Sequence, residues 1–154
     1  MPAANPSLCP CGSVLPFSQC CEPLISRQQV AQTPEQLMRS RYSAYFIKNE
    51  DYLLDSWHAS TRPDTLSLAS DTTQWKKLKI ISAASNVVEF IAFYTNVGTD
   101  REKIFALYEQ SHFIKEGSWF YQHGEAMENL TPSKNGLCPC KSGKKFKRCC
   151  GIEL

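Results

Sequence analysis

The sequence predicts an α+β protein, in which a helical segment is followed by antiparallel strands and a short cysteine-rich module lies at each end. Apolar side chains recur at helical spacing between residues 34 and 57, and from Trp75 onward they alternate with polar ones as in a strand. All eight cysteines fall into two clusters with the same spacing. Helices that precede a run of strands are typical of an α+β domain.

The helical segment has a clear local beginning. Thr33 is a suitable N-cap, Pro34 stands at the first helical position, and Gln36 stands where a capping box needs it. We expect this helix to end at Asn49 and a second helix to begin at Glu50. The side chains expected to face the core from these helices are Met38, Tyr42, Tyr45, Leu53, Leu54 and Trp57.

Four β-rich runs follow the helices. Glycine-containing segments at 96–103 and 116–118 predict hairpins between them, and residues 65–69 are expected to form a third short helix. The expected strands begin at Trp75 and then span 87–95, 104–115 and 119–123. The core residues expected on them are Val88, Phe90, Phe105, Leu107, Phe113 and Trp119.

None of these core residues belongs to a cysteine cluster. We therefore expect residues 34–124 to fold without either module, with residues 22–33 and 125–137 as linkers or peripheral arms. The domains predicted are 1–30, 31–128 and 129–154.

The beginning of the chain has no basic region or apolar run, and no stretch approaches the length needed to cross a bilayer. A soluble, cytoplasmic protein of 154 residues with a formal net charge of +2 is expected. Because reducing cytosol disfavours structural disulfides, clustered thiols in such a protein are expected to bind metal.

Each cysteine cluster reads Cys-Pro-Cys, eight residues, Cys-Cys. At a constant offset Ser13 also matches Ser142 and Phe17 matches Phe146, so the module is an internal repeat. The metal ligands predicted are Cys9, Cys11, Cys20 and Cys21 in the first copy and Cys138, Cys140, Cys149 and Cys150 in the second.

Four thiolates at tetrahedral corners are a structural zinc site, so two zinc ions per chain are expected. The filled coordination sphere disfavours a catalytic zinc. Ser142 is expected to cap a helical turn in its spacer, and Phe17 and Phe146 each to pack over their own metal site. A disulfide framework and an oxidation-sensitive switch are the alternatives.

Residues 138–151, Cys-Pro-Cys-Lys-Ser-Gly-Lys-Lys-Phe-Lys-Arg-Cys-Cys-Gly, closely resemble the SEC-C zinc motif of the SecA translocation ATPase tail. With one such motif at each end, around Leu-Met-Arg-Ser-Arg-Tyr-Ser-Ala-Tyr at 37–45 and Trp57-His58, the chain resembles the YchJ-like family of bacterial SEC-C proteins. The resemblance covers nearly the whole chain. It implies a middle domain similar to nuclear transport factor 2, whose helices pack in the concave face of a curved antiparallel sheet.

A cavity in such a domain would be lined from both layers. On the strand at 104–115, Glu109 and Ser111 share a face with apolar neighbours, and a buried Glu109 is expected to pair with Arg41 as a structural ion pair. His58 is expected to be a packing or capping residue. The possible cavity residues are Arg41, Tyr42, Trp57, His58, Glu109 and Ser111.

An enzyme is the less favoured class, because no Ser-His-Asp order, phosphate-binding glycine loop or metal-binding histidine spacing is visible. A small-molecule binder or enzyme that uses the middle cavity stays an alternative, as does a nucleic-acid-associated protein. The oligomeric state stays open. The favoured hypothesis is a zinc-binding adaptor.

The C-terminal module is the expected docking surface, because residues 134–154 contain six basic residues and one acidic residue. Residues 1–30 contain one of each. The lysines could instead offset the charge of the zinc site, but positions 12–19 of the other module contain no basic residue. The resemblance to the SecA tail, which contacts an acidic chaperone, implies an acidic protein partner; nucleic acid and anionic lipid are alternatives. The partner-binding residues predicted are Lys141, Lys144, Lys145, Lys147 and Arg148.

Overall fold

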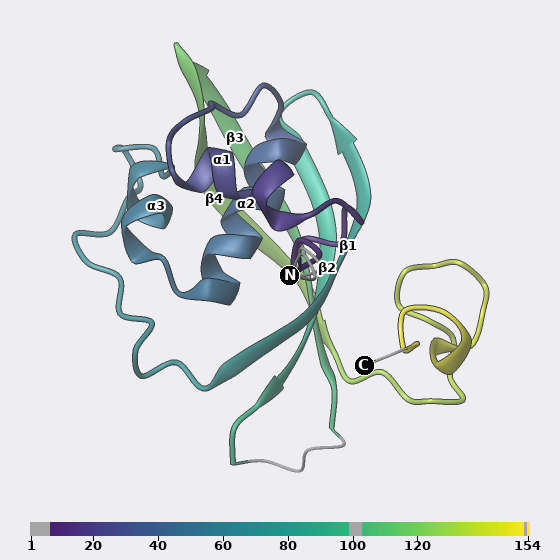
Figure 1. Cartoon of the computed structure of the whole chain (residues 1–154). Coiled ribbons are helices and arrows are strands. Elements are labelled where there is room, and N and C mark those ends of the chain that lie inside the picture. Colours follow the sequence, from purple (N-terminus) through teal and green to yellow (C-terminus); the bar gives the residue numbers. More distant parts are fainter. Residues whose placement is uncertain (1–6, 99–102, 153) are drawn as a thin grey trace, which may run out of the picture.

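The computed structural model describes residues 7–98, 103–152 and 154. Residues 1–6 and 99–102 lie outside the described residues. The expectation about the start of the chain and part of the hairpin expected at 96–103 depend on them. The predicted α+β fold is confirmed: helices cover one face of a curved four-stranded antiparallel sheet of order β1-β2-β3-β4 (Figure 1). The elements are η1 (Phe17–Gln19), α1 (Glu22–Ile25), α2 (Pro34–Ile47), α3 (Glu50–Asp55), β1 (Thr73–Ala84), β2 (Val87–Asn96), β3 (Phe105–Glu116), β4 (Ser118–Leu130) and η2 (Phe146–Arg148).

Helix α2 begins as the sequence predicts. The Thr33 side chain accepts a hydrogen bond from the Gln36 amide at 3.2 Å, and the Gln36 side chain accepts one from the Gln32 amide at 2.7 Å. The expected end at Asn49 was wrong, because Lys48 adopts a left-handed conformation (φ 59°) and ends the helix. Asn49 instead caps α3 through the Tyr52 amide at 3.0 Å.

The core between the helices and the inner face of the sheet contains Leu53, Val88, Phe90 and Phe113, all buried as expected. The other members of the expected core are half-buried. Trp119, for example, reaches the margin of the helical layer, where its indole N–H donates to the Gln32 carbonyl at 3.2 Å. The half-buried members are Leu54, Trp57, Phe105, Leu107 and Trp119.

Three segments differ from expectation. Residues 65–69 form no helix, because Leu68 is buried in an extended segment and its amide donates to Glu50 at 2.5 Å. Residues 22–33 are no linker, since α1 lies within them and Ile25 and Ala31 are buried in the core. Strand β4 continues to Leu130, because the backbone of β3 pairs with its polar second half.

The two cysteine modules pack on opposite faces of the sheet (Figure 1). Cys9, Cys11 and Cys21 belong to the inner core with the helices. Phe146 is buried on the outer face, with its ring centroid 5.5 Å from that of Phe93. Phe146 packs with the cysteines of its own module as expected, and it also contacts the sheet, which the sequence did not predict. The other buried residues under the C-terminal module are Ile91, Ala106 and Tyr108.

Within the described parts of the chain, no helix combines the length and the apolar character that a membrane span requires.

Candidate metal centres

In each cluster the structure gathers the four predicted cysteine sulfurs within 4.8 Å of one another. The Sγ atoms of Cys11 and Cys20 lie 3.6 Å apart, and those of Cys140 and Cys149 lie 3.5 Å apart. A tetrahedral zinc–thiolate site with bonds of about 2.3 Å has sulfur–sulfur edges of about 3.8 Å. All eight cysteines are free thiols. Both tetrads therefore fit a four-coordinate metal ion, and neither forms the disulfides of the alternative reading.

The two modules share their backbone hydrogen bonds as well as their cysteine spacing. The Cys9 amide donates to the Leu15 carbonyl at 2.8 Å, and the Cys138 amide donates to the Lys144 carbonyl at the same distance. These bonds close the loop after the first cysteine and direct its thiol toward the second. The short turns η1 and η2 then return the terminal cysteine pair to complete each tetrad.

The matched serines support the thiols. The Oγ atom of Ser13 lies 3.0 Å from the Cys20 sulfur, and that of Ser142 lies 3.2 Å from the Cys149 sulfur. Such a hydrogen bond orients a metal-bound thiolate and stabilises its negative charge. The expected cap at Ser142 was wrong, since η2 begins at Phe146 with Lys145 before it. The internal repeat showed that the two serines occupy equivalent positions. Their hydrogen bonds to cysteine sulfurs could not be predicted, because these depend on where the fold places each sulfur.

One thiol in each tetrad favours the thiolate form. Hydrogen bonds from the Cys21 and Cys9 thiols lower the pKa of Cys11 far below its ordinary value. Burial opposes ionisation of Cys140, but hydrogen bonds from Ser142 and Cys138 lower its pKa to about 6. Since thiolates are the metal-binding form, these positions are prepared for a cation.

The left-handed backbone of the two loops is the same, but glycine is placed differently. Gly12 and Val14 have φ values of 79° and 62°, and the equivalent Lys141 and Gly143 have φ values of 64° and 80°. Val14 is a β-branched residue in a region that costs such side chains energy. A Cβ at Gly143 would meet no atom within 4 Å, so only backbone strain opposes a side chain there.

We expect Gly143→Val to weaken metal binding at the C-terminal site and Val14→Gly to strengthen it at the N-terminal site. Each change should be about 1 kcal/mol, or roughly fivefold in metal affinity. Competition with a chelator, read at each site by NMR, measures both. Unchanged affinity in Gly143→Val would show that the site does not need the left-handed conformation.

Contacts across the fold fix each module in place. Arg39 of α2 donates to the Cys11 carbonyl at 2.8 Å, so a cation does stand beside the N-terminal site although the spacer has none. At the other site, Lys77 of β1 donates to the Cys150 carbonyl at 3.1 Å. Sequence reasoning missed both residues, because each is far along the chain from the cysteines it contacts.

The predicted basic surface divides into two parts. Lys141 donates to the Tyr108 hydroxyl at 3.4 Å and lies over its ring, so it attaches the module to β3. Lys144, Lys145, Lys147 and Arg148 are exposed. Among the described residues, none of these four side chains has an ion pair or hydrogen bond.

The inner face of the sheet contains a cavity of about 240 Å³. It is lined mainly by apolar and aromatic groups and is smaller than the roughly 300–1,000 Å³ of most ligand pockets. The Tyr42 hydroxyl in its lining is buried and has no hydrogen-bond partner among the described residues. Of the six cavity residues expected, those that line it are Arg41, Tyr42, Glu109 and Ser111, whereas Trp57 and His58 do not.

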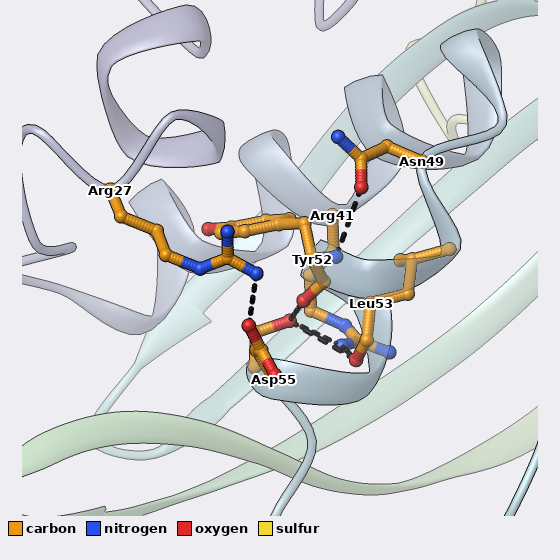
Figure 2. Close-up of polar contacts among 7 residues, drawn as sticks. Arg27, Arg41, Asn49, Tyr52, Leu53 and Asp55 are labelled. Carbon is orange, nitrogen blue, oxygen red and sulfur yellow. Dashed lines mark hydrogen bonds and ion pairs between the residues drawn. The ribbon is translucent and has the colours of Figure 1, made fainter.

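Arg41 is buried, yet no ion pair in the described structure joins it to Glu109. Its guanidinium donates to the Leu53 carbonyl and the Ser56 hydroxyl, each at 2.7 Å, at the end of α3 (Figure 2). It also lies over the Tyr121 ring, 4.3 Å from its centroid. Burial lowers the pKa of Arg41 and raises that of Glu109. These contacts give Arg41 a structural role.

His58 lies away from the cavity. Its Nε2 atom is 2.9 Å from a Glu116 carboxylate oxygen, and its Nδ1 atom is 2.6 Å from the Ser60 hydroxyl.

An ion pair between Arg27 and Asp55 joins the segment after α1 to α3 (Figure 2).

Comparison with known families agrees with this geometry. Residues 135–152 match the family model of the SEC-C motif, and residues 33–124 match the model described as the middle NTF2-like domain of YchJ. The fold and its cysteine sites thus define a SEC-C motif protein with an NTF2-like middle domain. The chain belongs to the YchJ family, and the resemblance seen in its sequence is confirmed.

Curated relatives extend the similarity over almost the whole chain. A UPF0225 protein of Vibrio cholerae serotype O1 is 41% identical over 154 residues, which cover 93% of this chain and 99% of the relative. A UPF0225 protein of Serratia proteamaculans is 39% identical over 157 residues, with 95% and 99% covered.

Two solved structures have the same fold. The solution structure of a SEC-C motif containing protein from Rhodopseudomonas palustris matches with a TM-score of 0.67 and 32% identity, covering 79% of this chain and all of that one. A crystal structure of a SEC-C motif containing protein from Psychrobacter arcticus matches with a TM-score of 0.61 and 24% identity, covering 96% and 97%. The latter supports the fold alone.

Proposed function

We propose that this chain is a cytoplasmic, zinc-binding adaptor that docks on an acidic protein surface through its C-terminal SEC-C module. The supporting observation is the exposed cluster of Lys144, Lys145, Lys147 and Arg148, whose side chains have no partner among the described residues. Four cations on one small module attract an acidic surface and direct its approach.

The attachment of the module supports a docking role. Phe146 packs against Phe93 and Lys141 contacts Tyr108, so the basic cluster is held on the sheet by its neighbours in the same loop. Because the loop is already ordered, binding a partner costs less conformational entropy than ordering a flexible tail.

Zinc is the metal we assign to both cysteine tetrads. The four sulfurs of each tetrad lie within 4.8 Å of one another, which suits a tetrahedral ion of borderline softness, and no ligand position is left for a substrate. The four cysteines of each tetrad would hold the ion. Its role in this proposal is to fold the modules.

Arg39 changes how the basic cluster is interpreted. A part-buried contact from α2 places a cation beside the N-terminal site, but Arg39 is also ion-paired with Glu35 at 3.1 Å, so its charge is largely offset within its own helix. The four exposed cations differ, because no described contact joins their side chains to any cysteine or to a carboxylate. They face solvent, where a partner can reach them.

The test is a charge reversal. Changing Lys144, Lys145 and Lys147 together to glutamate should reduce capture of the partner from cell extract by at least about tenfold, because three attractive contacts become repulsive. Elemental analysis should still find two zinc ions per chain. Capture by the unchanged protein should also fall steeply as salt is raised.

The matched control reverses three exposed lysines elsewhere, Lys76, Lys79 and Lys115, for the same change in net charge. This control should retain capture. Loss of capture after nuclease treatment would assign the surface to nucleic acid instead. Equal capture by the reversed and control variants would contradict the proposal.

A further inference from the structure

A cluster of nitrogen and oxygen ligands lies on the outer face of the sheet, apart from both cysteine tetrads. His112 of β3 is directly opposite His123 of β4, and their rings stack with centroids 4.5 Å apart and planes 8° apart. Glu125 follows two residues after His123, on the same face of β4. Its Oε1 atom lies 3.7 Å from the Nε2 atom of His112 and 3.9 Å from that of His123.

These separations are too long for hydrogen bonds. The Nε2 atom of His112 is buried and has no hydrogen-bond partner among the described residues. Leaving a buried polar atom without a hydrogen-bond partner costs about 1–3 kcal/mol of stability. A bound ligand would remove this cost. The lone pair of a neutral imidazole at this position is available to a cation.

The three ligand atoms lie within 4.8 Å of one another, close enough to bind one metal ion once the stacked His123 ring turns out of its parallel position. For bonds of about 2.0–2.2 Å, tetrahedral ligand atoms lie about 3.4 Å apart, a few tenths of an ångström closer than the atoms here. The His123 and Glu125 side chains are 48% and 60% exposed, so they can turn to bring a ring nitrogen and an oxygen onto the ion. His112, only 24% exposed, provides the fixed ligand.

We propose that His112, His123 and Glu125 form a third metal site, which takes a divalent first-row transition metal such as zinc or cobalt. Two imidazoles and one carboxylate suit these borderline cations. Three protein ligands leave at least one coordination position for water or for a group of a bound molecule. The site is therefore chemically open, in contrast to the closed tetrads.

The experiment adds cobalt to the full-length protein after its cysteine sites have been loaded with zinc. Paramagnetic cobalt should broaden the NMR signals of the His112 and His123 rings before other signals. The absorption bands of cobalt bound to thiolate should not appear in the same sample. His123→Ala and Glu125→Gln should each weaken cobalt binding by more than about tenfold.

His58→Ala is the matched control, because His58 also lies beside a carboxylate, that of Glu116, but has no second histidine. It should bind cobalt as the unchanged protein does. Circular dichroism and thermal unfolding show whether each variant keeps its fold, and the exposed position of His123 makes retention the expected result. Equal cobalt affinity in His123→Ala, or no selective broadening of the two rings with cobalt in large excess, would overturn the proposal.

Discussion

Replacing Cys11 with serine is expected to unfold the whole protein, whereas the equivalent Cys140→Ser is expected to unfold only the C-terminal module. Cys11 is fully buried in the same core as Leu53 and Val88, so loss of its metal opens the centre of the domain. Because metal binding provides folding free energy, the loss should be about 5 kcal/mol or more, comparable with the stability of a small domain.

Elemental analysis and thermal unfolding by circular dichroism measure this difference. Each variant should lose one of two zinc ions, but only Cys140→Ser should keep a cooperative transition for the sheet and helices. The substitution is the same at equivalent positions of the repeat, so each variant is the control for the other. A native-like transition in Cys11→Ser would mean that the inner core is stable without the N-terminal module, as the sequence alone had led us to expect.

Arg41→Met is expected to lower the free energy of unfolding by about 3 kcal/mol. The change leaves the Leu53 carbonyl and the Ser56 hydroxyl without their cationic donor inside the core. It also removes the positive charge that favours ionised Glu109 in the same cavity. Arg41→Lys should recover only part of the loss, because one ammonium group cannot make both hydrogen bonds and lie flat over the Tyr121 ring.

Chemical denaturation measures the change, and Arg62→Met provides the control. Arg62 is exposed, so the same substitution there should change the stability by less than about 0.5 kcal/mol. Arg41→Met with unchanged or higher stability would show that the desolvation cost of the guanidinium exceeds the value of its contacts.

The elements that the sequence predicted well are those fixed by local chemistry. The start of α2 depends on Thr33 and Gln36, three residues apart, and most of β3 shows side-chain alternation. The second half of β4 has no such alternation, since its side chains from Glu125 to Glu128 are exposed and its conformation comes from pairing with β3. Pairing between strands is a property of the folded chain.

The two cysteine tetrads were predictable for the same reason. Their spacing and its repetition lie in the sequence, and the structure gathers each set. The surroundings of the sites were not predictable. Arg39 reaches Cys11 across 28 positions of the chain, and Phe146 finds Phe93 on a strand more than fifty residues earlier. Likewise, His112 and His123 become neighbours only through the register of β3 and β4.

The position of Phe146 links the C-terminal cysteine tetrad to the solubility of the protein. While the module is folded, it covers Ile91, Phe93, Ala106 and Tyr108 on the outer face. Without its metal the loop would detach and leave an apolar patch in water, on a sheet whose inner core remains intact. Exposed patches of this kind promote self-association. Chelation or thiol oxidation at Cys140 and the other cysteines of its tetrad would therefore make the protein prone to self-association without unfolding its inner core.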